Sequence, residues 1–197
     1  MNADDSLLWE RSRAGDADAF TALFERHART IYIYCFRRIG DWSAAEDLLS
    51  VVFLEAWRRR DKQLPPGKVL PWLYGIATNV VRNRRRAERR YRAALSRVPA
   101  AESVADFGQD VAGRVDDERQ LRHALTLLAR LPRRQQEVFV LCAWSGLGYD
   151  DAAFALGVPA GTVRSRLSRA RRALEELDSA SGQEPGEVRG SQETAEG

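Results

Sequence analysis

The chain has 197 residues, of which 44% are apolar and 30% charged, and its 31 Lys and Arg against 28 Asp and Glu give a formal net charge of +3. This composition excludes a disordered chain, and the length suits one large domain or two small ones. No apolar run approaches the roughly 20 residues that cross a bilayer, so we expect no membrane insertion and a cytoplasmic protein. With two cysteines and two histidines, we expect neither a disulfide framework nor a metal site.

Helical periodicity dominates the first half of the chain, where strand signals are weak. We assign residues 1–15 to an N-terminal stub. Residues 16–38 are predicted to form a helix with one apolar face. Ser43 is a suitable N-cap for a second helix, which runs to about residue 60, and Glu46 completes a capping box with it.

A third helix is predicted from Trp72 to about Arg92, with Pro71 suited to its first turn. Residues 93–117 then lack periodicity, contain Pro and Gly, and carry a net charge of −3. This composition predicts an extended acidic linker.

Helical patterns resume at residue 118 and continue to about residue 177, with Pro132 opening one helix and glycines separating shorter ones. Residues 178–197 hold few apolar side chains and a net charge of −4, which predicts a disordered acidic tail. The fold class is therefore expected to be all-α, with two small helical domains, residues 16–92 and 118–177, joined by the acidic linker.

The positive charge is concentrated in two short blocks, one in each predicted domain. Residues 82–92 contain seven Arg and one Glu, and residues 164–172 contain five Arg and no acid. Lysine occurs only at positions 62 and 68, so nearly all positive charge is guanidinium, which forks onto phosphates and guanine edges. Two basic blocks with an acidic segment between them indicate two separate binding surfaces.

A helix-turn-helix pattern in residues 149–174 is the strongest motif. A short helix leads through a turn at Gly157 into a second helix whose apolar side chains recur at helical spacing. The side chains predicted on the outward arc of this second helix are Thr162, Arg164, Ser165, Arg166, Ser168, Arg169 and Arg172. A charged helix face is usually only solvated, but this arc lacks acids for salt bridges, which favours DNA binding.

Residues 70–90 combine aromatic side chains with amides and arginines. Trp72 and Tyr74 precede Asn79 and Asn83, and stacking faces beside polar side chains and a basic flank are what single-stranded bases require. The alternative, that the aromatics are core residues and the arginines are solvated, is equally compatible with the spacing.

Residues 43–57 form an amphipathic pattern with acids away from the apolar stripe. Such a face is ordinarily solvated, and apolar Val51 and Leu54 beside Glu55 hint at a protein-binding surface.

Four segments, in this order, resemble bacterial RNA polymerase sigma factors of the extracytoplasmic-function (ECF, group 4) type of the sigma-70 family. GDADAFTALFERH resembles the family's region 2.1, AEDLLSVVFLEAW region 2.2, and LPWLYGIATNVVRNRRR regions 2.3 and 2.4. The helix-turn-helix segment, with the LPRRQQEVFVLCAWSGLG that precedes it, resembles region 4.

The resemblance implies a role for each surface. The helix with the outward arc would read the −35 promoter element in the major groove, and the region 4 domain would also contact the β flap of the polymerase. The loop from Asp61 to Val69 and the helix after it would open and read the −10 element as single-stranded DNA. The residues implied at the −10 element are Trp72, Asn79, Arg82, Asn83, Arg85 and Arg86. Those implied in docking on the β′ clamp helices of the polymerase core are Asp47, Ser50, Val51, Leu54 and Glu55.

The sequence thus predicts a promoter-specificity subunit that needs no cofactor and is not an enzyme, because it lacks nucleophile–base, metal and phosphate-loop motifs. Its implied partners are RNA polymerase core, promoter DNA and an anti-sigma factor. Two other classes stay open on the residues alone: a helix-turn-helix regulator with an N-terminal dimerisation or sensing module, and a helical scaffold that binds no DNA.

Overall fold

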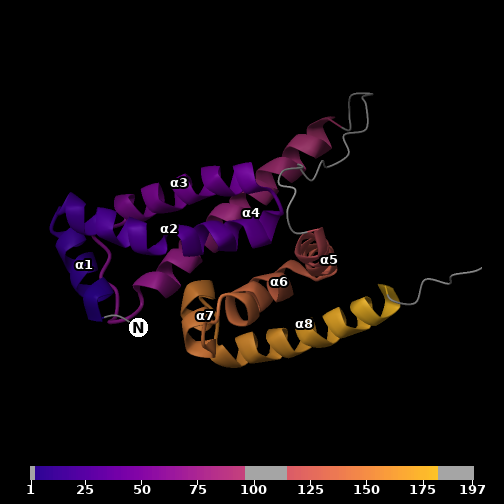
Figure 1. Ribbon diagram of the computed structural model, residues 1–197. Helices are drawn as coiled ribbons and strands as arrows, with labels where there is room; N and C mark the ends of the chain where they lie inside the picture. Colours follow the sequence, from indigo (N-terminus) through magenta and orange to yellow (C-terminus); the bar gives the residue numbers. More distant parts are fainter. Residues whose placement is uncertain (1–2, 96–114, 182–197) are drawn as a thin grey trace, which may run out of the picture.

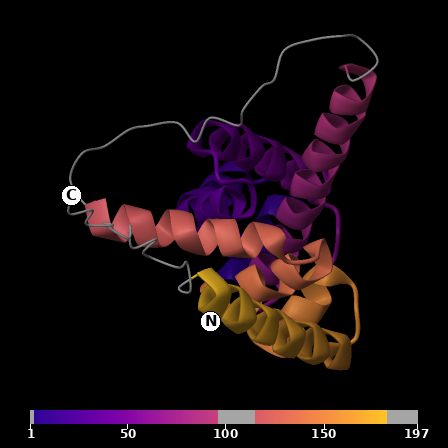
Figure 2. The same cartoon turned by 90° about the vertical axis from the view of Figure 1, so that its right-hand side faces the viewer.

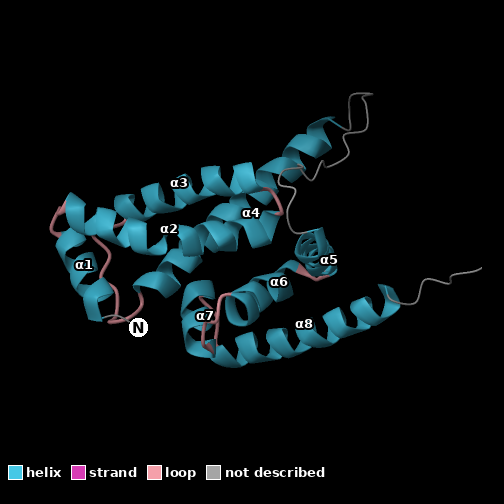
Figure 3. Ribbon diagram, viewed as in Figure 1, coloured by secondary structure: helices cyan, strands magenta, loops and turns pink. Residues whose placement is uncertain are grey.

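The computed structural model describes residues 3–95 and 115–181, with side chains from Asp5 to Leu95 and from Arg119 to Ala180. Over these residues the chain forms eight α-helices and one π-helical turn, with no strand, which confirms the all-α prediction (Figure 3). In the same residues, no helix combines the length and apolarity that a bilayer crossing requires.

The first four helices pack into one bundle: α1 (Ala3–Arg13), α2 (Ala17–Ile39), α3 (Trp42–Arg58) and α4 (Val69–Leu95) (Figure 1). The predicted bounds of α2 hold closely because both of its ends carry strong signals. The Asp16 carboxylate accepts a hydrogen bond from Ala19 N at 3.0 Å, and Gly40 ends the helix with φ 76°. Buried Leu23, Ile31 and Tyr34 lie on the predicted apolar face.

The helix α3 begins earlier than predicted, because its N-cap is Asp41 and not Ser43. The Asp41 carboxylate accepts a hydrogen bond from Ala44 N at 3.0 Å, and Ser43 lies inside the first turn with an exposed side chain. Both residues are good caps by type, and the one directly after the Gly40 turn is used.

The expected N-terminal stub is the helix α1, and it contributes to the core. Leu8 and Trp9 are 8% and 2% exposed, and the Trp9 ring meets Trp72 edge-on with 4.7 Å between ring centroids. The sequence pattern conceals this helix because polar Asp5, Ser6 and Ser12 share its inward-facing turns with the two apolar residues, so no continuous apolar stripe forms.

The second unit contains α5 (Val115–Arg130), α6 (Arg133–Phe139), the π-helical turn η1 (Val140–Trp144), α7 (Tyr149–Leu156) and α8 (Ala160–Ser181). Helices α7 and α8 form the predicted helix-turn-helix, with Gly157 at φ 64° in the turn between them. Helix α8 continues past residue 177, so the first residues of the expected disordered tail are helical. Residues 182–197 of that tail, and residues 96–114 of the expected linker, lie outside the described residues.

The two units pack directly against each other, with α7 beneath the N-terminal half of α4 (Figure 1). The approach is close at Gly75, where a Cβ atom would lie 2.7 Å from the carbonyl oxygen of Ala155 in α7. The C-terminal end of α4 projects beyond the rest of the molecule (Figure 2), and residues 91–95 are all exposed. The sequence predicted two domains but did not predict this contact between them.

Candidate nucleic-acid and polymerase interfaces

The outward face of α8 is built as the sequence predicts. Val163, Leu167 and Ala170 are at most 2% exposed and anchor the helix on its own unit. Of the seven side chains predicted on the outward arc, Thr162 and Arg166 are half-buried and the other five are exposed. Among the described residues, the arginines of the arc form one ion pair with a carboxylate, the long one between Arg172 and Glu176 at 3.7 Å. The structure thus presents guanidinium and hydroxyl groups together on one solvent-facing strip.

A shallow hollow adjoins this strip where α8 meets the start of α7. The Arg164 guanidinium lies 5.6 Å from the centroid of the Tyr149 ring, which is a cation–π distance. Arg171 and Ser168 line the same hollow. The aromatic ring therefore favours one position of an arginine near the N-terminal end of the helix, where base edges are read in helix-turn-helix proteins.

The polar side chains predicted on α4 divide into two groups. Asn79, Asn83 and Arg86 are exposed, and Asn79 Oδ1 accepts a hydrogen bond from Arg82 Nη1 at 3.3 Å. Trp72 is only 6% exposed and packs on Trp9, so the Trp72 ring is a core element here and has no face free to stack on a base. For Trp72 and Tyr74, which is 1% exposed, the core alternative left open by the spacing is the one that the structure adopts.

Arg82 and Arg85 point from α4 into the second unit, where they bind α6. The Arg82 guanidinium donates two hydrogen bonds to the Glu137 carboxylate, Nε to Oε1 at 2.7 Å and Nη2 to Oε2 at 2.6 Å. Arg85 donates to Gln136 Oε1 at 2.9 Å and to the Arg38 carbonyl oxygen. We call this set the interdomain contact.

The interdomain contact is a buried charge cluster, and its electrostatics follow from that burial. Glu137 is 2% exposed and Arg38, which donates to Gln136 Oε1 at 3.0 Å, is also 2% exposed. The hydrogen bonds to Glu137 raise the pKa of Arg82, whereas burial, with help from the charges of Arg38 and Arg133, lowers the pKa of Arg85 to about 10. A buried carboxylate is tolerated only when paired. Glu137 therefore depends on Arg82 of α4 and on Arg38 of α2, whose Nη2 lies 3.8 Å from Glu137 Oε1.

Two further contacts join the units outside this cluster. Arg37 donates to the carbonyl oxygen of Trp144 at 2.5 Å and lies over its ring. The Lys68 ammonium pairs with the Asp151 carboxylate at 2.7 Å. Sequence reasoning found none of these partners, because Gln136 and Glu137 follow two arginines on a short helix and resemble an ordinary solvated turn.

The face of α3 predicted to dock on the polymerase is exposed. Asp47, Ser50, Val51 and Leu54 are open to solvent, with Val51 42% and Leu54 48% exposed. Glu55 differs from them, since Arg58 and Arg59 hold its carboxylate at 3.1 and 2.7 Å. These hydrogen bonds, led by the one from Arg58, lower the pKa of Glu55.

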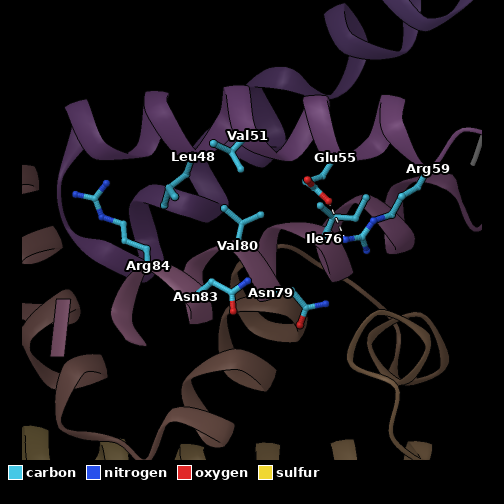
Figure 4. A pocket seen from close by; sticks show the side chains of 9 residues that line it. All are labelled: Leu48, Val51, Glu55, Arg59, Ile76, Asn79, Val80, Asn83 and Arg84. Atoms are coloured by element: carbon cyan, nitrogen blue, oxygen red, sulfur yellow. Dashed lines mark hydrogen bonds and ion pairs between the residues drawn. The ribbon is translucent and has the colours of Figure 1, made fainter. Parts of the chain in front are cut away.

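A groove of about 380 Å³ runs between this face and α4 (Figure 4). Leu48 and Val51 of α3 point toward Val80 of α4 and form its apolar floor, while Asn79 and Asn83 stand on the opposite rim. The structure therefore places side chains predicted for polymerase docking and side chains predicted for DNA on the two walls of one groove. The residues that line it are Leu48, Val51, Glu55, Arg59, Ile76, Asn79, Val80, Asn83 and Arg84.

Comparison with known proteins decides the family. Residues 23–91 match the model of Sigma-70 region 2, and residues 121–174 match that of Sigma-70, region 4. RNA polymerase sigma factor CarQ of Myxococcus xanthus is 33% identical over 168 residues, which are 85% of this chain and 94% of CarQ. The chain belongs to the sigma-70 family. The ECF RNA polymerase sigma factor SigW of Bacillus subtilis (strain 168) is 30% identical over 168 residues, 82% of this chain and 90% of SigW, which places this sigma factor in the ECF group.

A solved structure agrees with this membership. The sigma factor RpoE in complex with the anti-sigma factor NepR, from Bartonella quintana, matches with a TM-score of 0.63 and 25% identity, over 81% of this chain and 96% of that one. As a sigma factor, the protein directs RNA polymerase to promoters and is not an enzyme, and the stand-alone regulator is not favoured.

Proposed function

We propose that the outward arc of α8 reads the −35 element as duplex DNA. The observation that carries this proposal is the exposed strip itself, in which arginines and hydroxyls occur without an intervening acid from Thr162 to Arg172. Arginine pairs with guanine edges and short hydroxyls pair with either bases or phosphates, so one strip supplies both base recognition and anchoring.

The −10 element is assigned to α4 and to the loop from Asp61 to Lys68 that precedes it. Asn79, Asn83 and Arg86 are available in the present arrangement, and Arg82 and Arg85 become available when they leave Glu137 and Gln136. Trp72 supports this surface from the core and does not contact a base. Arg82 and Arg85 thus cannot bind −10 DNA and maintain the interdomain contact at the same time. Promoter binding therefore separates the two units.

The exposed face of α3 is assigned to binding of the polymerase core. Asp47, Ser50, Val51 and Leu54 lie against the β′ clamp helices. Glu55 contributes together with Arg58 and Arg59, which pair with its carboxylate. The region 2 unit comprises residues 3–95, and the region 4 unit comprises residues 115–181. The region 4 unit contacts the β flap of the polymerase. Because the RpoE relative was solved with an anti-sigma factor, we also assign an anti-sigma factor to this protein as a partner. Its place of action is the cytoplasm, where core polymerase and promoters are found.

A transcription assay tests these assignments. Purified core polymerase is given a genomic promoter library with and without the protein, and the start sites are mapped. We expect initiation only with the protein, at sites that share two sequence elements, with protection extending over both. Initiation without the protein at the same sites, or protection of a palindrome in the absence of polymerase, would contradict the proposal and favour a dimeric regulator.

A further inference from the structure

We propose that α1 positions the loop from Asp61 to Lys68 for capture of −10 DNA, with Trp9 and Ser6 as its positioning residues. This inference rests on the −10 role assigned above to that loop. It concerns a helix that lies outside both matched family segments, since the region 2 match begins at residue 23.

The loop has few hydrogen bonds of its own. Within it, Lys62 N bonds to Arg59 O and Lys68 N bonds to Pro65 O, and the two adjacent prolines lack an N–H donor. A segment held this weakly by itself has many accessible conformations, and ordering it on DNA would cost conformational entropy.

Helix α1 supplies the missing attachments at three backbone points. The Trp9 indole Nε1–H donates to the carbonyl oxygen of Lys62 at 3.0 Å, Ser6 Oγ accepts from Gly67 N at 3.1 Å, and Arg13 Nε donates to the carbonyl oxygen of Asp61 at 3.4 Å. Residues 6, 9 and 13 follow helical spacing and form one stripe of α1. Figure 3 shows the loop running beside this helix.

A second stripe of α1 anchors the helix to the bundle. The Asp5 carboxylate binds His27 Nε2 at 2.9 Å and Arg26 Nη1 at 2.5 Å on α2, and Leu8 and Ser12 are buried on the same side. Helix α1 is therefore anchored to α2, and it also binds both ends of the loop, at residues 61–62 and at residue 67. Pre-ordering a binding loop in this way removes the ordering cost from the DNA-binding step.

The test compares substitutions that remove single attachments. Trp9→Phe keeps an aromatic ring against Trp72 but removes the indole donor, and Ser6→Ala removes the acceptor for Gly67. Ser12→Ala is the matched control in the same helix. The Ser12 hydroxyl is buried on the anchoring stripe and donates to Leu8 O, so its removal perturbs α1 without removing an attachment of the loop. Each variant is assembled with core polymerase and assayed on the promoter that the wild-type holoenzyme selects, and on single-base variants of its −10 and −35 elements.

We expect the preference for the selected −10 bases over their variants to fall about tenfold in the Trp9→Phe, Ser6→Ala double variant, because the loop loses two of its attachments and the cost of ordering it then falls on the DNA-binding step. The −35 preference should not change, and Ser12→Ala should match the wild type. Hydrogen exchange of the free protein should show faster exchange at residue 67 in the variants that lack Ser6.

Equal loss of the −10 and −35 preferences would show a general structural defect and would overturn the positioning role. Faster loop exchange with an unchanged −10 preference would overturn it as well. A failure of the proposed −10 role of the loop can be distinguished from these outcomes. In that case the wild-type holoenzyme itself would show no preference among −10 sequences.

Discussion

The side chains on the outward arc of α8 differ in how tightly the protein itself holds them. Arg164 rests on the Tyr149 ring, and Arg172 has a distant carboxylate, whereas Arg169 is exposed and has no contact among those that the structure describes. An arginine without an internal partner breaks no protein contact when it binds DNA, so its removal reports the DNA contact without the loss of an internal one.

We therefore expect Arg169→Ala to weaken −35-dependent initiation by about tenfold, since a lost base contact costs roughly 1–3 kcal/mol. The measurement is abortive initiation on the selected promoter and on a promoter with a scrambled −35 element. Arg29→Ala, an exposed arginine of α2 far from the arc in sequence, is the control. An equal effect of Arg169→Ala on both promoters would place this side chain outside the −35 contact.

The surroundings of the two cysteines disfavour their thiolate forms. Burial raises the pKa of the Cys35 thiol to about 12 from an ordinary value of 9.0, and burial also raises the pKa of Cys142. A thiol with so little thiolate at neutral pH reacts poorly with oxidants and alkylating reagents. The unfolded chain ionises Cys35 at lower pH than the folded protein does, so this group stabilises the fold below pH 9.0 and that stabilisation is lost as the pH rises toward about 12.

At pH 8 we expect iodoacetamide to leave Cys35 unmodified in the folded protein and to modify it in urea, as read by mass spectrometry. Cys142, which is only half-buried, serves as the internal comparison and should react slowly. Modification of Cys35 at the rate of a free thiol without urea would show that its surroundings open in the native state.

At the scale of elements, the parts that the sequence predicts well are those where local signals and packing agree. Asp16 and Gly40 determine where α2 begins and ends. The buried stripe of Val163, Leu167 and Ala170 determines which face of α8 points outward. The parts that it misses depend on tertiary partners: α1 buries polar side chains against α2 and the loop, and Glu137 is understood only beside Arg82. The same limit applies to the DNA surfaces, where spacing identified exposed Asn79 and Asn83 but could not separate them from buried Trp72.

The end of α8 gives a prediction at this scale. Asp178 pairs with His123 of α5 at 2.8 Å, but the two side chains are 66% and 49% exposed, and exposed pairs contribute about 0–1 kcal/mol. We expect removal of residues 178–197 to leave initiation nearly unchanged and to lower the melting temperature only slightly. Asp178→Ala in the full chain is the control, and lost initiation in the truncation alone would reveal a separate function of the tail.

At the scale of the molecule, the arrangement of the two units sets a balance between internal and external partners. In the proposed function, the guanidinium groups of Arg82 and Arg85 leave Glu137 and Gln136 in order to bind DNA. The free energy of the interdomain contact would then be subtracted from that of promoter binding. A variant that weakens the interdomain contact without changing a side chain assigned to DNA measures how far this contact opposes promoter binding.

Gly75→Ala is such a variant, because the new Cβ would lie 2.7 Å from the Ala155 carbonyl oxygen, closer than real Cβ atoms approach backbone. We expect a larger radius of gyration by small-angle X-ray scattering and initiation at lower concentrations of the protein. Gly161→Ala, with no atom within 4 Å of its Cβ, is the matched control for the radius.

Glu137→Gln should produce the same shift by weakening the Arg82 pair. A Gly75→Ala protein that keeps the wild-type radius would contradict the separation, and one that expands without gaining initiation would show that the contact does not compete with DNA.

Gly75 also has an effect on the helix that contains it. A glycine within a helix is less favourable than alanine by about 1 kcal/mol, and glycines are places where helices bend. In the present arrangement, the backbone of Ala155 in α7 lies directly against this glycine. Once the units part, we expect α4 to curve more readily between Trp72 and Asn79. Under the proposed −10 role of α4, separation would therefore change the curvature of this helix as well as release its arginines.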